Sequence, residues 1–208
     1  MKPTQGPRAQ KAPRFDPGAL EDPVAKLTEW GPSKGGGASF CTHVLRDDAP
    51  ARLSFRPAVG AIIFHSVFFL AGTGMVVLGV TTALETSTPA PLFVMGLVGL
   101  LFGSIGAAML WSGTQPIVFD RAQGRYWKGW SPPPPDFGTG VELTAIHALQ
   151  VVSEYCGGKT RFYSYELNLV LKDGTRVNVV DHGDAARLRR DGSTIARFLG
   201  VPLWDPEP

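Results

Sequence analysis

Few residues in this chain have side chains that could perform catalysis, and their spacing matches no catalytic motif. The suggestive groups are Cys41, Cys156, His147, His182 and Asp181. Asp181 and His182 are adjacent and could form half of a hydrolase dyad, but neither a nucleophile-elbow serine nor an H-E-x-x-H motif is identified beside them. Metal binding needs three or four converging ligands, and the four histidines are scattered along the chain. The sequence therefore predicts no enzyme, no catalytic residue, no metal site and no cofactor, with His182 in a structural or capping role.

A second group of residues could bind a ligand through charge and aromatic rings. The candidate interaction surface consists of Lys159, Arg161, Tyr163 and Tyr165. Such a surface could bind a lipid headgroup or a peptide. The alternative is that these tyrosines, together with Tyr155, pack against one another across neighbouring strands.

These groups lie on either side of two long apolar segments. Val59–Leu84 and Pro91–Trp111 contain no charged residue. A helix rising about 1.5 Å per residue needs about 20 apolar residues to cross a hydrocarbon layer about 30 Å thick. The sequence therefore predicts a transmembrane helical hairpin at residues 58–112. His65, near the start of the first segment, is interpreted as a neutral, hydrogen-bonded side chain.

The second apolar segment carries a stripe of four glycines on nearly the same helix face. Small residues allow helix backbones to approach closely in lipid. The stripe predicts either packing against the first helix or contact with another chain, including a homodimer. Its members are Gly96, Gly99, Gly103 and Gly106.

Basic residues flank the predicted hairpin on both outer sides, whereas the short loop at 85–90 has none. Because basic residues near the membrane ends favour the cytoplasm, both termini are predicted to be cytoplasmic and the hairpin to lie in the inner (plasma) membrane. The formal net charge of +2 is too small to indicate a nucleic-acid partner. Two distant cysteines without a cluster are typical of free thiols in a reducing compartment.

The remaining segments divide into three parts. Residues 1–26 are rich in proline, glycine and basic residues, and a disordered tail is expected there. Residues 27–57 are expected to form a loop and a β-hairpin, with strands at 39–45 and 51–56. Residues 113–205 are predicted to form a small antiparallel β domain, because alternating apolar residues and Gly-containing turns indicate strands. A terminal amphipathic helix is predicted at 185–199, followed by Gly200.

The order of these elements resembles that of the pleckstrin-homology-like (PH-like) domains of bacterial membrane proteins. PIVFDRAQGRYWKG (residues 116–129) is similar to their opening hairpin. YELNLVLKDGTRVNVVDHG and ARFLGVPLWD are similar to segments of an uncharacterised group of bacterial two-pass membrane proteins. The resemblance implies an α+β fold, with a membrane hairpin preceding a bent sheet or barrel and a C-terminal helix.

The same resemblance implies a membrane-anchored interaction module that binds a protein partner or lipid headgroups, without catalysis. The alternative expectation is an accessory or structural subunit of a larger membrane complex, packing through the glycine-rich second helix.

Overall fold

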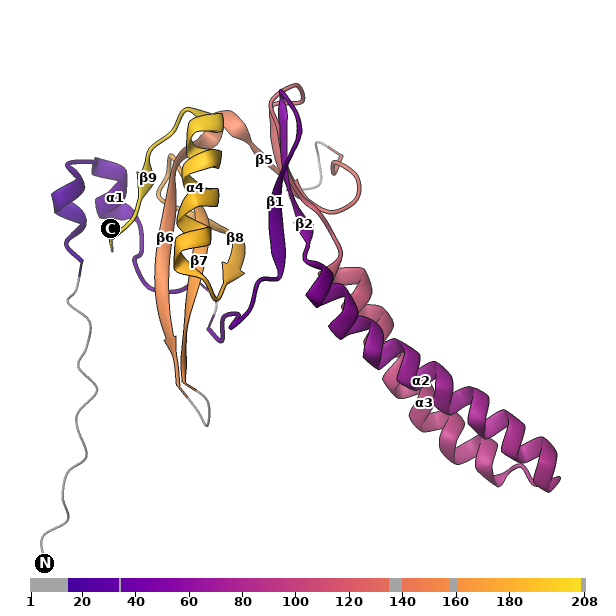
Figure 1. Cartoon of the computed structure of the whole chain (residues 1–208). Coiled ribbons are helices and arrows are strands. Elements are labelled where there is room, and N and C mark those ends of the chain that lie inside the picture. Colours follow the sequence, from indigo (N-terminus) through magenta and orange to yellow (C-terminus); the bar gives the residue numbers. More distant parts are fainter. Residues whose placement is uncertain (1–14, 34, 135–139, 158–160, 207–208) are drawn as a thin grey trace, which may run out of the picture.

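The computed structural model describes residues 15–33, 35–134, 140–157 and 161–206. Two long helices run side by side away from a domain that contains two β-sheets and two shorter α-helices (Figure 1). The predicted α+β combination of a helical hairpin with antiparallel sheets is therefore confirmed.

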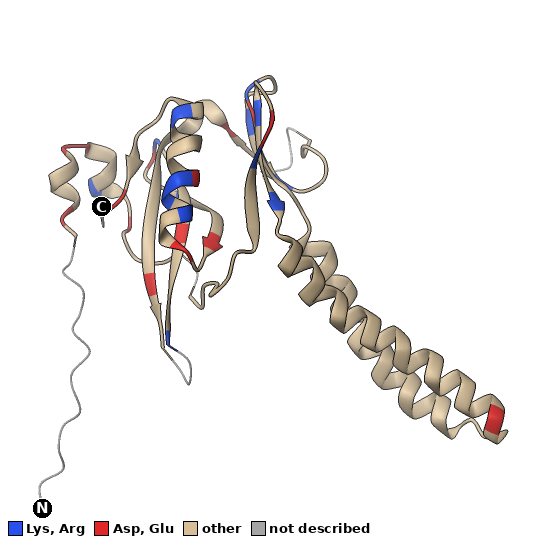
Figure 2. Ribbon diagram, in the orientation of Figure 1, with Lys and Arg blue, Asp and Glu red and all other residues tan. Residues whose placement is uncertain are grey.

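The helical hairpin consists of α2 (Val59–Thr86) and α3 (Ala90–Gly113). Both helices are long and apolar enough to cross a membrane, and their apolar side chains are mostly exposed. Within this hairpin, Figure 2 shows charge only at the far end of α2, where Glu85 lies. These exposed side chains form a large apolar surface, and contact of such a surface with water is unfavourable. The pair thus consists of two candidate membrane-spanning helices.

The first sheet has five antiparallel strands in the order β1-β2-β3-β4-β5. Phe55 of β2 pairs with Ile117 of β3, so the helical hairpin is inserted between two neighbouring strands. The segments on either side of the hairpin, 27–57 and 113–205, therefore contribute strands to one sheet. The strands are β1 (His43–Ala49), β2 (Arg52–Pro57), β3 (Ile117–Asp120), β4 (Arg125–Lys128) and β5 (Gly140–Glu142).

Strand β1 extends further along the chain than predicted, because its acidic residues do not form the turn. The Asp48 carboxylate accepts hydrogen bonds from the Ser54 hydroxyl at 2.6 Å and from Arg56 at 3.0 Å across the strand pair. These cross-strand contacts keep Asp48 within the sheet, and the turn to β2 lies at Pro50 and Ala51.

The second sheet has four strands in the order β8-β7-β6-β9. A 3-10 turn, η2 (Leu143–Ala145), leads into β6. The short strand β9 pairs with β6 in parallel, a contact between distant segments that no local pattern predicts. The strands are β6 (Ile146–Cys156), β7 (Phe162–Leu171), β8 (Arg176–His182) and β9 (Leu203–Trp204).

Helix α4 (Ala185–Leu199) lies over the second sheet and closes the main core. The Asp184 carboxylate accepts a hydrogen bond from the backbone N–H of Arg187 and caps the first turn. Gly200 ends the helix with a φ of 73°, a conformation that glycine adopts without steric cost. The core combines side chains of both sheets and the helix, including Phe55, Leu167 and Ile195, which are 0% exposed.

The outer face of the second sheet is covered by residues that the sequence assigned to a disordered tail. Residues 1–14 of that tail lie outside the described residues, but the prediction is wrong for its second part. Asp16 caps η1 (Pro17–Leu20) and Asp22 caps α1 (Pro23–Leu27). The segment is ordered because its apolar residues pack against Ala148, Val170 and Trp204 of the sheet.

Hydrogen-bond register shows which parts of the two sheets lie near the helices. His43 pairs with Pro57, two residues before α2, and Ile117 pairs with Lys128, four residues after α3 ends at Gly113. This end of the domain is called the helix end. Cys41 forms a bridge with His182, so the last residues of β8 also belong to the helix end.

Candidate functional site at the helix end of the domain

A polar cavity of about 230 Å³ lies at the helix end, where the two sheets and α3 meet. Its walls come from the start of β1, the end of α3, β4 and β8. It brings together one lysine, one histidine, one aspartate and several uncharged polar side chains. The lining residues are Ala38, Thr42, His43, Ser112, Gln115, Ile117, Lys128, Asn178, Val179, Val180 and Asp181.

His43 connects the cavity wall to the end of α3. Its Nε2 lies 3.3 Å from the Gln115 carbonyl oxygen, which can only accept, and its Nδ1 lies 3.1 Å from the Thr42 hydroxyl. Burial holds the pKa of His43 below its ordinary value, and the nearby Lys128 ammonium acts in the same direction. His43 is therefore a neutral hydrogen-bonding group at neutral pH.

From β8, the cavity wall also receives an aspartate, Asp181, whose side chain is held by a hydrogen bond. The Asn178 side-chain amide donates to the Asp181 carboxylate at 2.9 Å, and the Thr42 hydroxyl lies 3.4 Å from the Asp181 backbone carbonyl. The backbone N–H of Ala58 donates to the Thr42 carbonyl at 2.8 Å, directly before α2. The cavity thus holds a cation on β4 and an anion on β8, within a wall joined to the first residue of the helical hairpin.

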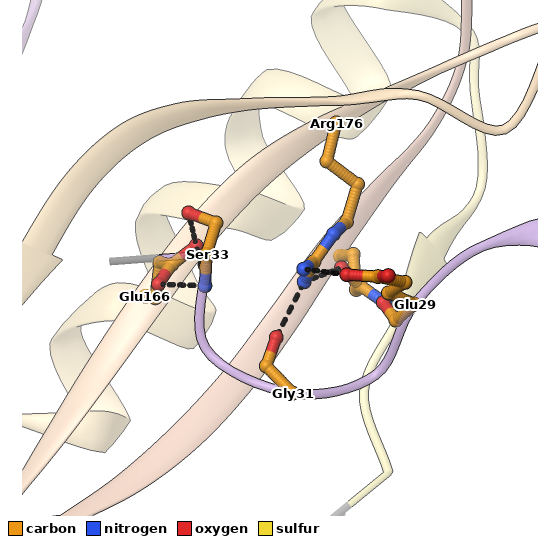
Figure 3. A network of polar contacts seen from close by, with 6 residues as sticks. Glu29, Gly31, Ser33, Glu166 and Arg176 are labelled. Atoms are coloured by element: carbon orange, nitrogen blue, oxygen red, sulfur yellow. Dashed lines mark hydrogen bonds and ion pairs between the residues drawn. The ribbon is translucent and has the colours of Figure 1, made fainter. Parts of the chain in front are cut away.

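The segment that leads into the cavity wall is held on the outer face of the second sheet. This segment, residues 29–33 and 35–37, is called the strap. The buried Glu166 carboxylate of β7 accepts hydrogen bonds from the Ser33 backbone N–H, at 2.9 Å, and from its hydroxyl (Figure 3). Arg176 of β8 donates to the Gly31 carbonyl at 2.6 Å and forms an ion pair with Glu29 at 3.6 Å.

Two further contacts complete the strap. The Gln150 side chain donates to the Glu29 carbonyl at 3.0 Å. The Glu154 carboxylate accepts from the backbone N–H groups of Gly36 and Gly37 at 3.2 and 3.3 Å. A side chain at Gly37 would overlap Ser164, so glycine is required for this close approach. The strap thereby fixes the chain immediately before Ala38, the first residue of the cavity wall.

The strap also contains a short match to the nucleophile-elbow motif of serine hydrolases. Residues 31–35 read G-P-S-K-G and fit the bare string G-x-S-x-G. Ser33, however, lies in an irregular segment and its hydroxyl donates to Glu166, whereas a nucleophile elbow requires a turn from strand to helix. The match is therefore coincidental. The sequence feature that relates to the strap is Glu166, the one charged residue of β7.

Of the catalytically suggestive residues, Cys41, Asp181 and His182 lie close together at the helix end, because Cys41 bridges to His182. His147 lies elsewhere, and the contacts of both histidines are structural. His182 is buried, accepts a hydrogen bond from the Asp184 backbone N–H at 2.9 Å, and has a pKa lowered by burial and by Arg187. His147 lies 2.8 Å from Asp22 and joins β6 to the start of α1. No group of three or more metal-ligating side chains occurs among the described residues.

Neither cysteine has the low thiol pKa that a nucleophile needs. Both are free in the structure, at 41 and 156. Burial raises the pKa of Cys41, and burial together with the Glu154 carboxylate raises the pKa of Cys156. Both thiols therefore stay protonated at neutral pH.

The predicted interaction surface is only partly gathered in one place. Lys159 lies outside the described residues. Tyr163 is exposed and its ring centre lies 5.2 Å from that of Tyr155 on the opposite strand, so these rings pack across the strand pair while remaining accessible. Tyr165 is partly buried against the main core, and Arg161 is exposed at the start of β7.

The glycine stripe lies at the contact between α2 and α3. A Cβ atom at Gly99 would come within 2.7 Å of the Gly72 carbonyl oxygen, and one at Gly106 would overlap the backbone of Phe69. Gly103 also lies beside Gly72. Gly96 lies near Gly79, whose added Cβ would approach the Gly96 nitrogen to 3.4 Å. These close approaches place the stripe against the first helix of the same chain.

His65 lies beside the last residue of α3, where a side chain at Gly113 would collide with its ring. It therefore fills the contact between the two helices at the helix end.

Comparison with protein-family models and with curated proteins gives no match to this chain. The cavity and its surroundings are accordingly the basis for assigning a function.

Proposed function

We propose that this protein is a membrane-anchored binding module whose two-sheet domain takes up a phospholipid headgroup in the cavity at the helix end. The observation that carries the proposal is the position of the cavity: Ser112 and Gln115, at the end of a candidate membrane-spanning helix, form part of its wall. A headgroup in the adjoining bilayer surface would reach this opening without leaving the membrane.

The charges in the cavity favour a headgroup that carries both a phosphate and a primary ammonium group. Lys128 supplies a cation for the phosphate, and Asp181 supplies an anion for the ammonium. The neutral His43 and the Thr42 side chain supply uncharged polar groups in the same cavity wall. A primary ammonium can donate several hydrogen bonds to a carboxylate, whereas a trimethylated ammonium has no N–H to donate.

The resemblance to PH-like domains supports the same proposal. The resemblance implies a bent sheet or barrel with a C-terminal helix, and two sheets that share a core with α4 are compatible with that architecture. In this proposal, α2 and α3 span the inner membrane, and the basic residues that flank them hold the domain on the cytoplasmic side. The glycine stripe then packs the two helices together. The proposal requires no contact between α3 and another subunit.

The test is lipid retention by the full-length protein. We would purify it from nanodiscs that contain phosphatidylethanolamine, phosphatidylcholine and phosphatidylglycerol in equal amounts, and identify the retained lipids by native mass spectrometry. Preferential retention of phosphatidylethanolamine is expected, and Lys128→Ala and Asp181→Asn should each abolish the preference.

Lys172→Ala is the matched control, because Lys172 is an exposed lysine in the turn between β7 and β8, at the opposite end of the domain. It should retain lipid as the unaltered protein does. Equal retention of the three lipids by the unaltered protein, or unchanged preference in both cavity variants, would show that the cavity does not bind this headgroup.

A further inference from the structure

Exposed aromatic side chains are distributed unevenly over the domain. Outside α2 and α3, the described part of the chain exposes five large hydrophobic side chains, of which four are aromatic. The aromatic residues are Phe40 (50% exposed), Trp130 (57%), Tyr155 (51%) and Tyr163 (57%), and the fifth residue is Leu27 (71%). Exposing large aromatic rings to water is unfavourable, so their common location calls for a physical reason.

The register of the first sheet places Trp130 at the helix end. Lys128, the last residue of β4, pairs with Ile117, and the backbone N–H of Gly129 donates to the Pro116 carbonyl at 2.8 Å. Trp130 follows directly and therefore lies close to the segment that leaves α3. Trp111, in the last turn of α3, is also exposed (67%).

The register of the second sheet places the other three rings at the same end. Phe40 immediately precedes Cys41, which bridges to His182, and His182 pairs with Tyr165 of β7. Tyr163 lies two residues beyond Tyr165, toward the tip of the β6–β7 hairpin, and Tyr155 faces it on β6. In Figure 1 the end of β6 and the start of β7 lie on the side of the sheet toward which α2 and α3 leave the domain.

We propose that Phe40, Trp130, Tyr155 and Tyr163 form an aromatic rim that inserts into the headgroup layer of the bilayer. Tyrosine and tryptophan favour this layer because they combine an apolar ring with a polar group. Lys128 and Arg161 are exposed next to rim residues and provide cations for lipid phosphates. The first sheet would thus contact the membrane at Trp130 and the second sheet at the β6–β7 tip.

The rim goes beyond the binding module proposed above, because it sets the orientation of the whole domain. Contacts from both sheets prevent the domain from swinging about the two chain segments that join it to α2 and α3. They also keep the opening of the cavity at the level of the lipid headgroups. The inference rests on α2 and α3 spanning a bilayer, but it does not depend on which ligand the cavity holds.

The test measures how close single positions come to the lipid. In a full-length background with Cys41→Ser and Cys156→Ser, we would introduce Phe40→Cys, Trp130→Cys or Tyr163→Cys and attach a bimane fluorophore. Each labelled protein is reconstituted into liposomes that carry a nitroxide on the lipid headgroup. Quenching of all three labels is expected to be several-fold stronger than that of a label at Leu27→Cys.

Leu27 is the matched control because it is exposed to a similar extent but lies beside Gly174, in the β7–β8 turn far from the helix end. A label at Leu101→Cys, in the middle of α3, with a nitroxide on the acyl chain, reports whether the helices span the bilayer. Strong quenching at Leu101 combined with equal, weak quenching at 27, 40, 130 and 163 would overturn the rim while leaving the anchoring intact. Weak quenching at Leu101 would overturn both.

Discussion

Burial of histidine side chains links single residues of this domain to pH. His43 and His182 both have pKa values held below the ordinary value of 6.5, in each case mainly by burial. His43 lies in the cavity wall, and His182 is the last residue of β8, where it accepts from the Asp184 backbone N–H. The folded domain therefore favours the neutral form of both rings.

Acidification is expected to destabilise the domain before its carboxylates are protonated. In the unfolded chain both histidines bind protons near pH 6.5, whereas the folded chain binds them only at lower pH. The contribution of both rings to the free energy of unfolding is therefore complete above about pH 6.5 and is lost as the pH falls toward the lowered pKa values. The melting temperature of the detergent-solubilised protein should fall between about pH 7.5 and pH 5.5.

The variant His182→Gln isolates this effect, because it removes one of the two titrating groups. Its melting temperature should depend less steeply on pH than that of the unaltered protein, whatever its absolute stability. Asp191 opposes the trend, since burial raises the pKa of its carboxyl and favours folding at lower pH. A slope for His182→Gln as steep as that of the unaltered protein would contradict the assignment of a depressed histidine pKa.

The sequence indicates which chemistry is absent, but it does not indicate which distant residues contact one another. The absence of a catalytic arrangement was an expectation from spacing alone, but the cavity joins residues from 38 to 181 that no local pattern connects. The strap was missed because its contacts use backbone groups of Gly31, Gly36 and Gly37, which carry no side-chain signal. Only the charged Glu166, alternating with the apolar residues of β7, indicated that something polar covers that face.

At the scale of elements, the contact between α2 and α3 depends on the absence of side chains at a few positions. A Cβ atom at Gly99 would come within 2.8 Å of the Val76 backbone nitrogen as well as close to Gly72. Gly74, in α2, has no atom within 4 Å of an added Cβ. The two glycines therefore provide a matched pair of positions.

Gly99→Leu is expected to force the two helices apart, and overpacking of this kind costs about 1–3 kcal/mol. Gly74→Leu should change the stability little, because its side chain would extend into open space. Thermal unfolding in the same detergent compares the two variants directly. A similar melting temperature for both would show that the glycines are not required for close packing of the helices.

Elements with a strong internal pattern were predicted well, and elements that depend on distant partners were not. The two apolar helices follow from uninterrupted apolar sequence. The β3–β4 and β7–β8 strand pairs follow from alternation and glycine turns. In contrast, α1 has only five residues and β9 only two, so each is stable only because it packs on or pairs with the second sheet. Local propensity is too weak to indicate elements of this length.

At the scale of the whole molecule, the helical hairpin replaces the turn of a β-hairpin. Strands β2 and β3 are antiparallel neighbours, paired from Arg52 with Asp120 to Phe55 with Ile117. The rest of the domain, including η1, α1 and both sheets, lies outside the hairpin. Residues 58–114 are therefore dispensable for the strand pairing itself.

Replacement of residues 58–114 by Asn-Gly should yield a soluble, folded domain. Asn-Gly favours the type I′ turn that connects two antiparallel strands. Pro57 and Gln115 would then be joined by this turn, with the register of β2 and β3 unchanged. The expected result is a monomer with a cooperative thermal transition and the circular dichroism of a β-rich protein.

A chain restricted to residues 114–206 is the corresponding control. It lacks β1 and β2, which leaves β3 as an open edge and removes Leu53 and Phe55 from the core. This chain should aggregate or remain unfolded. A stable fold for residues 114–206 alone would show that the first two strands are not an integral part of the domain.

The insertion of two apolar helices between β2 and β3 also fixes an order of events during synthesis. Strands β1 and β2 leave the ribosome before either apolar helix, and their partner β3 follows only after both. Translation of β3 therefore begins only after both candidate membrane-spanning helices have been made. A chain that stops within the hairpin lacks β3, β4 and the entire second sheet. Completion of the domain therefore requires that both candidate membrane-spanning helices have already been synthesised.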